Sequence, residues 1–302
     1  RKSVIIADPK QPKEKKEQLI RAFAHALRDA GDYIFGPDMG TNEESMAWVR
    51  DEIGRSVGLP REIGGIPLDE IGATGWGLFQ AAQVAVPYCD FELSGAKVVV
   101  QGFGSVGKHA ARFLNHEGAL LVGTSDSSGG IYNQGGLDVS ALIQHKSQHL
   151  PITSFPGGTA CTQDDILDMA CDIWIPAARP DVVNEDNVSR LNTKLVLQGA
   201  NIPFTHGAEK QLHQQGVCIV PDFIANAGGV ICAAMEYQGT TESIAMQVIE
   251  DKIRRNTEEV LTISHRDTIT PREAATKMAM QRVNKAMGFR RWNTFSNAPN
   301  YL

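Results

Sequence analysis

Residues 102–107 form a glycine-rich turn whose spacing suits the binding of phosphate groups. A β-branched apolar run leads into the sequence Gly-Phe-Gly-Ser-Val-Gly, and a helix-like segment, 108–116, follows it. Gly102 permits a tight turn from strand to helix, Gly104 lets the backbone approach a pyrophosphate, and Gly107 lets the helix pack closely on the strand. The free N–H groups and partial positive charge at the start of that helix attract phosphate oxygens.

Asp126 extends this pattern from a phosphate site to a nucleotide site. A second apolar run, 119–122, follows the helix, and Asp126 lies about 20 residues beyond the turn, where an acid accepts hydrogen bonds from ribose hydroxyls. A glycine turn alone is a weak signal, but strand, helix, second strand and acid occur here in the required order. We therefore predict a dinucleotide site rather than an ordinary strand–helix–strand unit. An acid at this position repels a 2′-phosphate, and Ser127 rather than a basic residue follows it, which favours NAD while leaving NADP possible.

Three further segments with small or amide side chains follow predicted strands. Apolar runs predict these strands at 172–176, 194–198 and 217–220. The residues of interest after them are Ala177, Ala178, Asn201 and Asn226. In a doubly wound sheet, ligands bind outside the carboxyl ends of the strands. Each segment alone is best interpreted as an ordinary turn, but three in succession favour a binding site.

Strands alternate with helices over residues 72–238, which predicts a parallel sheet covered on both faces. Right-handed crossovers then give a doubly wound, Rossmann-like α/β domain that binds the dinucleotide. Residues 1–71 and 239–302 are expected to form a second, discontinuous domain made from the start and the end of the chain. Its C-terminal helices would pack against the first segment, residues 1–6 would be a strand, and 54–71 a loop or hinge. Helices are expected at 13–30, 43–55, 73–88, 163–170, 183–190, 206–215, 227–237, 241–265 and 271–287.

Composition excludes several classes of protein. A chain of 302 residues is long enough for two domains that share a cleft. The net charge of −6, without a long basic run, argues against nucleic acid as a partner. No apolar run is long enough to span a membrane and no signal peptide is visible, so we expect a cytoplasmic protein without membrane contact. The five cysteines lack C-x-x-C spacing, which predicts reduced thiols rather than disulfides or a metal site.

Motifs over nearly the whole chain match one known family in order. They are K-S-V-I-I-A-D-P at 2–9, G-P-D-M-G-T-N at 36–42, G-A-T-G-W-G at 72–77, G-F-G-S-V-G at 102–107, S-D-S-S-G-G-I-Y at 125–132, P-A-A at 176–178, G-A-N at 199–201 and P-D-F-I-A-N-A-G-G-V at 221–230. The chain thus resembles the glutamate/leucine/phenylalanine/valine dehydrogenases, which are NAD(P)-dependent amino-acid dehydrogenases. The ensemble is far more specific than the glycine turn alone.

This resemblance implies the reversible oxidative deamination of an L-amino acid to a 2-oxo acid and ammonia. Lys2 matches the catalytic lysine, which activates water for attack on the iminium left after hydride transfer. Asp38 matches the catalytic aspartate, which carries protons to and from the nitrogen. Burial in a cleft favours the neutral form of a lysine, and a carboxylate transfers protons at neutral pH. We expect Lys2→Ala and Asp38→Asn each to abolish turnover while leaving dinucleotide binding intact.

The same resemblance implies the remaining contacts. Thr74 would hold the nicotinamide amide, and Asn201 and Asn226 would lie near the nicotinamide and the substrate. The full cofactor set would be Thr74, Gly102, Gly104, Ser105, Val106, Gly107, Asp126, Ser127, Ala177, Ala178, Asn201 and Asn226. The substrate set would be Lys2, Asp38, Asn226, Val230 and Ala233. The resemblance also implies a homo-oligomer, a hexamer in many relatives.

Two departures from the family pattern limit what carries over. Relatives have a further N-terminal stretch with another lysine that binds the substrate carboxylate. The resemblance implies that residues 1–71 and 239–302 belong to a discontinuous α/β substrate domain, and that this domain is partly missing because the chain begins inside it. Glutamate-specific relatives have a serine where this chain has Ala233, which offers no hydrogen bond to a side-chain carboxylate. That favours leucine, valine or phenylalanine, whereas the motifs at 36–42 and 125–132 are closer to the glutamate branch. We place L-glutamate first and keep branched-chain or aromatic amino acids as the alternative.

Two other functions remain open. The chain could be a dinucleotide-binding subunit without catalysis, although Lys2 and Asp38 argue against it. It could also be a Rossmann enzyme of another class, such as a malic-enzyme-like or hydroxy-acid dehydrogenase. Those enzymes usually place a catalytic histidine or a metal-binding acid cluster in the cleft. The eight histidines here fall mostly in predicted helices or their flanking loops, which weakens that alternative.

Overall fold

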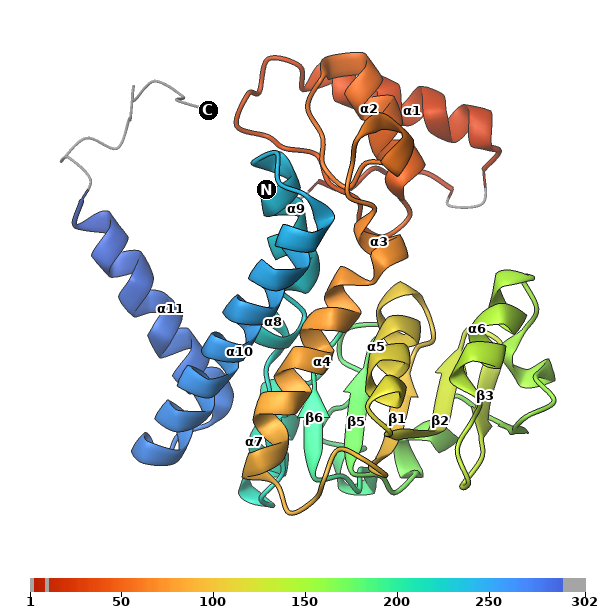
Figure 1. Ribbon diagram of the computed structural model, residues 1–302, viewed down its shortest axis with the longest axis vertical. Coiled ribbons are helices and arrows are strands. Elements are labelled where there is room, and N and C mark those ends of the chain that lie inside the picture. Colours follow the sequence, from red (N-terminus) through yellow and green to blue (C-terminus); the bar gives the residue numbers. More distant parts are fainter. Residues whose placement is uncertain (1–2, 9–10, 290–302) are drawn as a thin grey trace.

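A seven-stranded sheet forms the centre of the larger part of the molecule (Figure 1). The computed structural model describes residues 3–8 and 11–289, so the predicted catalytic Lys2 lies outside the described residues. The strands are β1 (Lys97–Gln101), β2 (Leu120–Asp126), β3 (Gly129–Tyr132), β4 (Thr159–Cys161), β5 (Ile173–Pro176), β6 (Leu195–Leu197) and β7 (Cys218–Val220). Their order across the sheet is β4-β3-β2-β1-β5-β6-β7. The predicted doubly wound α/β fold is confirmed.

Pairing within the sheet is parallel from β2 to β7 and antiparallel at one edge. β1 pairs in parallel with both β2 and β5, and β6 continues that direction to β7. β3 and β4, which the sequence did not predict, add to β2 as antiparallel strands. From β1 the chain proceeds first to β2 on one side and later to β5 on the other. The switch point therefore lies between β1 and β5, where parallel sheets of this kind bind ligands.

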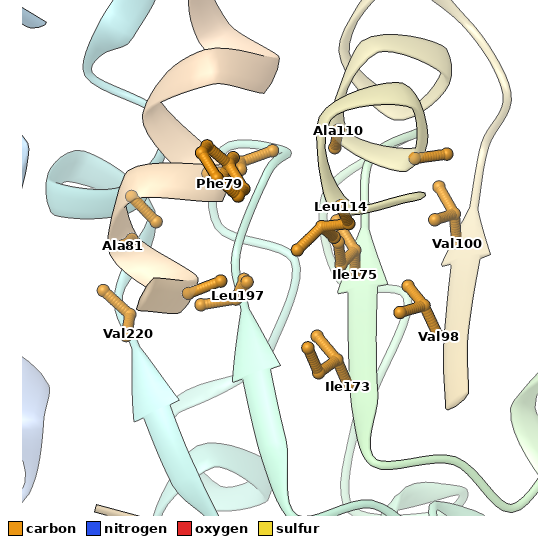
Figure 2. Close-up of a cluster of buried hydrophobic side chains, with 14 of the residues drawn as sticks. Phe79, Ala81, Val98, Val100, Ala110, Leu114, Ile173, Ile175, Leu197 and Val220 are labelled. Carbon is orange, nitrogen blue, oxygen red and sulfur yellow. The ribbon is translucent and has the colours of Figure 1, made fainter. Parts of the chain in front are cut away.

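Side chains of alternate strand residues bury themselves on opposite faces of the sheet. Figure 2 shows one face, where Val98 and Val100 of β1 and Ile173 and Ile175 of β5 point toward two helices. Val99 lies between the first pair and packs into the other core. This period of two is the reason why apolar runs rich in Val and Ile form strands here rather than helices.

Helices cover both faces of the sheet. Those that contribute to the site or its supports are α4 (Ala73–Ala85), α5 (Ser105–His116), α6 (Val139–Ser147), α7 (His206–Gln214), α8 (Asp222–Ala225), α9 (Gly228–Tyr237), α10 (Glu242–Asp267) and α11 (Pro271–Met287). α4 and α5 supply Phe79, Ala81, Ala110 and Leu114 to the core of Figure 2. Among the described residues, no helix is both long and apolar enough to cross a membrane.

The first segment packs around a small core of its own. It contains α1 (Lys13–Ala26), α2 (Glu43–Ile53), a 3₁₀ turn (Arg61–Ile63) and the short α3 (Leu68–Ile71). Asn42 caps α2 by accepting a hydrogen bond from the Ser45 backbone N–H at 3.1 Å. Its core is formed by Ile20, Ala24, Phe35, Met46, Val49 and Leu59.

The C-terminal helices contact mainly the part of the molecule that contains the sheet. α10 lies alongside α4, and the Trp76 indole donates a hydrogen bond to the Met246 carbonyl at 3.2 Å (Figure 1). The start of α10 also reaches the first segment, where Glu242 forms an ion pair with Arg61. The expected packing against residues 1–71 is therefore found at the start of α10, and the rest of this helix packs along α4. The proposed division at residues 71 and 238 remains a prediction.

Three expected elements differ in the structure. Residues 3–6 form no strand, and Val4 and Ile6 are 90% and 99% exposed, since no described strand offers them a hydrogen-bonded neighbour. The helix expected at 163–170 is only a 3₁₀ turn (Asp165–Asp168). The one expected at 183–190 is likewise a 3₁₀ turn (Val188–Arg190).

The physical reason for both short turns is competition by polar side chains. The Asp165 carboxylate accepts a hydrogen bond from the Thr162 backbone N–H at 2.8 Å. The Asn187 side-chain oxygen accepts one from the Asn184 N–H at 2.8 Å, and its amide donates to the Val182 carbonyl at 3.0 Å. These local bonds offer the backbone an alternative to helical pairing.

Candidate active site

The glycine-rich turn lies at the switch point of the sheet. Gly102 has a φ of +101°, and a Cβ there would lie 2.8 Å from the Cβ of Ala178 and 3.0 Å from the carbonyl of Ala177. The Ala177 N–H donates to the Gln101 carbonyl at 2.7 Å, which holds the two loops together. The carboxyl ends of β1 and β5 are therefore in contact, and only glycine fits between them.

Gly107 and Gly104 are glycines for different reasons. A Cβ at Gly107 would lie 1.9 Å from the Gly102 carbonyl oxygen and 2.8 Å from Val100 Cγ1, so the first turn of α5 packs directly on β1. A Cβ at Gly104 would meet no atom within 4 Å. The protein's own packing therefore explains Gly107 but not Gly104. The open space beside Gly104, at the start of α5, is where a phosphate would approach the backbone.

Ser105 and Val106 connect this turn to neighbouring segments. The Ser105 hydroxyl donates to the Asp69 carboxylate at 3.0 Å, which joins the start of α5 to the first segment. A Cβ at Gly199 would lie 3.2 Å from Val106 Cγ1, so the loop after β6 contacts α5. No side chain caps α5, since its N-cap residue is Gly104. The helix start thus keeps its backbone N–H groups available for an anion.

Asp126 has a basic partner that its sequence neighbours do not reveal. Its carboxylate forms a short ion pair with Lys146 of α6 and accepts hydrogen bonds from the Ser128 N–H at 2.7 Å and hydroxyl at 2.6 Å. Burial by itself would raise the pKa of Asp126, but the bonds from Lys146 and Ser128 outweigh it and lower that pKa. The Asp126 side chain remains 12% exposed. An ionised carboxylate beside an ammonium group therefore stands at the end of β2.

Thr74 lies in the first turn of α4, where α9 begins beside it. A Cβ at Gly228 would lie 2.1 Å from the Ala73 carbonyl oxygen, and one at Gly229 would lie 2.7 Å from Thr74 Oγ1. These two glycines allow the first turns of α4 and α9 to touch. Because Asn226 lies two residues before α9, Thr74 and Asn226 belong to the same end of the sheet.

Asn201 and Asn226 meet although they follow different strands. The Asn226 amide donates to the Asn201 side-chain oxygen at 2.8 Å and to the Gly199 carbonyl at 3.3 Å. The Gly199 and Ala200 N–H groups both donate to the Pro176 carbonyl, at 3.0 and 2.7 Å. The three loops predicted from small and amide residues therefore form one continuous surface beside the glycine turn.

The residues predicted to bind the substrate lie in two parts of the structure. Val230 and Ala233 lie one turn apart on α9, with Val230 75% exposed and Ala233 half-buried. Asp38 lies in the first segment, in the loop that leads into α2. Its carboxylate accepts a hydrogen bond from the Met39 N–H at 2.8 Å. Its backbone carbonyl accepts one from the Thr41 N–H at 2.8 Å, which closes the turn. The first segment is tied to α9 by Glu236, which accepts hydrogen bonds from the Gly58 and Leu59 N–H groups.

A cleft of about 390 Å³ separates the first segment from α5. Ser105 and Lys108 line the side formed by α5. Glu43, Arg61 and Asp69 line the opposite side. Ser105 of the glycine turn therefore borders this cleft, whereas Asp38, Thr74, Asn201 and Asn226 are not among its lining residues.

A buried ionic network supports the asparagine loop and was not anticipated from the sequence. Arg272 of α11 pairs with Glu209 at 2.8 Å and with Asp222 at 3.1 Å. Asp222 in turn accepts a hydrogen bond from the Ile202 N–H at 2.7 Å, next to Asn201. Ile202 has a φ of +48°, a conformation that a β-branched residue rarely adopts. A charge on the C-terminal helix thus fixes the loop that carries Asn201.

His109 is buried where α4 and α5 pack together. It is 5% exposed, and a Cβ at Gly72 would lie 2.4 Å from its ring Cγ. Burial lowers the pKa of His109 from 6.5 to about 4, and the charges of Arg112 and Lys108 add to the effect. The ring is therefore neutral at pH 7 and serves as packing rather than as an acid or base.

This shifted pKa predicts a pH dependence of stability. Between pH 6.5 and about 4 the unfolded state binds a proton that the folded state does not. The free energy of unfolding should fall by about 3 kcal/mol as the pH falls through that window, and it should be fully retained above it. Urea unfolding at pH 7.5 and pH 4 measures this. His109→Gln should remove that part of the dependence, whereas His116→Gln, at an 85% exposed side chain, should not. An unchanged pH dependence in His109→Gln would reject the assignment.

Comparison with known proteins identifies the family that this chain is similar to. The model of the Glutamate/Leucine/Phenylalanine/Valine dehydrogenase family matches residues 64–291. A glutamate dehydrogenase of Aeropyrum pernix is 34% identical over 316 residues, which cover 96% of this chain and 75% of that protein. An NADP-specific glutamate dehydrogenase of Saccharolobus shibatae is 34% identical over 249 residues, covering 78% and 59% respectively.

Solved structures share the fold. A hetero-hexameric glutamate dehydrogenase from Thermus thermophilus has a TM-score of 0.85 at 24% identity and covers 95% of this chain and 72% of that one. An L-tryptophan dehydrogenase from Nostoc punctiforme has a TM-score of 0.67 at 24% identity and covers 94% and 76%. Together with the sequence matches, these likenesses confirm the family resemblance inferred from the motifs.

Proposed function

This chain belongs to the glutamate/leucine/phenylalanine/valine dehydrogenase family of amino-acid dehydrogenases, and from that premise we propose that it carries out the reversible oxidative deamination of L-glutamate. The products are a 2-oxo acid and ammonia. One observation carries the proposal. The glycine turn, Thr74 and the Asn201–Asn226 pair meet at one edge of the sheet.

The residues present fit a nicotinamide dinucleotide. The open space at Gly104 and the uncapped start of α5 suit a pyrophosphate, and Asp126 suits a ribose. When bound, the nicotinamide supplies the hydride acceptor or donor for the substrate α-carbon. We assign Thr74 and Asn201 to holding its ring, with Asn226 placed to contact both ring and substrate.

Asp38 supplies the proton transfer in this proposal. Its carboxylate is held by the Met39 N–H and stands on a loop of the segment opposite the dinucleotide. In the deamination direction it accepts a proton from the substrate nitrogen, and in the reverse direction it returns one. Lys2, outside the described residues, is assigned the activation of water. The two residues thus divide proton transfer to nitrogen from attack at carbon.

The substrate is argued from the relatives and from α9. The Aeropyrum and Saccharolobus relatives are named for glutamate, whereas the Nostoc relative is named for L-tryptophan. Ala233 offers no donor to a side-chain carboxylate, so glutamate would need its partner from elsewhere in the pocket. A branched-chain or aromatic L-amino acid is the second candidate, and exposed Val230 beside Ala233 favours it.

A substrate series on the whole protein tests this choice. L-glutamate, L-leucine, L-valine and L-phenylalanine are compared by kcat/KM with the same dinucleotide. We expect L-glutamate to exceed the others by about 100-fold or more, as a site built for a charged group rejects analogues that lack it. A higher kcat/KM for any of the three apolar amino acids would replace glutamate by that substrate class.

We propose NAD as the preferred dinucleotide, with Lys146 controlling how strong the preference is. The Asp126 carboxylate repels a 2′-phosphate, while the ammonium of Lys146 beside it attracts one. Lys146→Ala should therefore lower the ratio of kcat/KM for NADP over NAD by about 10-fold, which is about 1.4 kcal/mol. Lys285→Ala, at an exposed lysine of α11, serves as the control. An unchanged ratio would show that Lys146 does not face the 2′ position.

We also propose that this chain forms an oligomer. The Thermus relative is described as hetero-hexameric, and the resemblance implies a homo-oligomer for this chain. Light scattering of the purified whole protein distinguishes a hexamer from smaller assemblies. A monomer at micromolar concentration would reject the proposal.

A further inference from the structure

Two cysteines lie together at the end of the sheet opposite the candidate site. Cys218 begins β7, and Cys89 follows the 3₁₀ turn after α4 (Val86–Tyr88). Both contact the same carbonyl group. The Cys218 N–H donates to the Lys194 carbonyl at 2.9 Å, and Cys89 Sγ lies 4.0 Å from that oxygen. The pair therefore joins the last turn of the α4 region to the edge of the sheet.

The two thiols act on each other and pack against the same hydrophobic core. A hydrogen-bonding interaction with Cys218 lowers the pKa of Cys89, and the same interaction raises the pKa of Cys218. Lys194 also lowers the pKa of Cys89, whereas burial and Asp90 oppose the shift. Neither residue is fully buried. Cys89 is thus the more nucleophilic sulfur, and Cys218 holds the proton.

The remaining cysteines have different surroundings. Burial raises the pKa of Cys171 and of Cys232 to about 12. Cys161 is half-buried, and burial also raises its pKa. All five cysteines are free thiols in the structure. A small oxidant should therefore discriminate between Cys89 and the other three.

We propose that Cys89 and Cys218 are a reversible oxidation site that forms a disulfide in the presence of a hydroperoxide. The Cys89 thiolate attacks one peroxide oxygen, the O–O bond breaks, and Cys89 becomes a sulfenic acid while hydroxide leaves. Cys218 then attacks the Cys89 sulfur, and its proton leaves with the sulfenic oxygen as water. Two sulfurs lose two electrons in total, and one peroxide is reduced to hydroxide and water. A dithiol reductant reverses the change.

The location gives the bond a structural consequence. α4 begins beside Thr74 at the candidate site, and the chain reaches Cys89 shortly after this helix ends. A disulfide would fix that end to β7 and close a long loop of chain between the two cysteines. Loop closure restricts the unfolded chain, so the oxidised protein should melt several degrees higher than the reduced one.

Peptide mapping after treatment of the whole protein with hydrogen peroxide tests the proposal. Free thiols are blocked with iodoacetamide, and the digest is analysed without reduction. We expect a cross-linked pair of peptides containing Cys89 and Cys218, which dithiothreitol separates. We also expect Cys89 to react at least about 10-fold faster than Cys161, in keeping with its thiolate character.

Variants separate the two roles. Cys218→Ser should stop at a Cys89 sulfenic acid that dimedone traps, and Cys89→Ser should leave Cys218 unmodified. Cys161→Ser is the matched control and should still form the bond. Melting curves of the reduced variants confirm that each is folded. Reaction confined to Cys161, or Cys89 and Cys218 both still alkylated after peroxide treatment, would overturn the proposal.

Discussion

Replacing Gly104 by valine should weaken dinucleotide binding by at least about 100-fold, or about 2.7 kcal/mol, without lowering the melting temperature. The backbone at Gly104, with φ −86° and ψ −158°, is extended and accepts any L-residue. Its Cβ position meets no protein atom within 4 Å. A side chain at this position begins in the space that we assign to the pyrophosphate. The expected loss therefore reports on the ligand rather than on the fold.

Two other glycines serve as controls for that result. Gly31→Val makes the same change in open space away from the site and should alter neither property. Gly107→Ala should lower the melting temperature, because its Cβ would lie 1.9 Å from the Gly102 carbonyl oxygen. Isothermal titration with NADH and thermal unfolding measure the two effects. Unchanged affinity in Gly104→Val would place the dinucleotide elsewhere.

Asp38→Asn should reduce kcat by about 1,000-fold while leaving the Kd for NADH unchanged, since positioned acids and bases contribute 10² to 10⁴. An asparagine oxygen can still accept the hydrogen bond from the Met39 N–H, so the turn should keep its shape. What the variant loses is the ability to accept and return a proton. The expected change therefore appears in kcat rather than in binding or stability.

The control for this substitution is Asp29→Asn, whose side chain is 91% exposed. It removes the same charge from the first segment and should leave kcat unchanged. Steady-state rates and fluorescence titration of NADH are measured on the whole protein. A kcat for Asp38→Asn within about 3-fold of the parent value would remove Asp38 from the mechanism.

The arrangement of the glycine turn with its strand and helix was predictable because the signals for it are local in sequence. The turn at 102–107 fixes the strand, the helix and their contact within a short stretch of chain. The topology of a parallel sheet then predicts that Ala177, Asn201 and Asn226 share one edge, and their hydrogen bonds agree. Their roles toward cofactor and substrate remain predictions. The family assignment, which rested on the order of many motifs, is confirmed.

The supports of the site were not predictable because they join residues far apart in the chain. Lys146 reaches Asp126 from α6, and nothing in its neighbours indicates that contact. Arg272 forms an ion pair with Asp222 although the whole of α9 and α10 separates the two residues in the chain. A charged residue near a helix start is usually solvated, so its burial depends on tertiary packing alone. The antiparallel β3 and β4 were missed for a related reason: short edge strands depend on pairing rather than on pattern.

The central claim is tested most directly by the ammonium dependence of NADH oxidation. The whole protein is mixed with NADH and 2-oxoglutarate, and NADH absorbance is followed with and without ammonium ions. An amino-acid dehydrogenase of the kind proposed here oxidises NADH only when ammonium is present, and forms L-glutamate in equal amount. Oxidation at the same rate without ammonium would identify a hydroxy-acid dehydrogenase instead. No oxidation with ammonium, for any of the corresponding 2-oxo acids, would contradict a catalytic role.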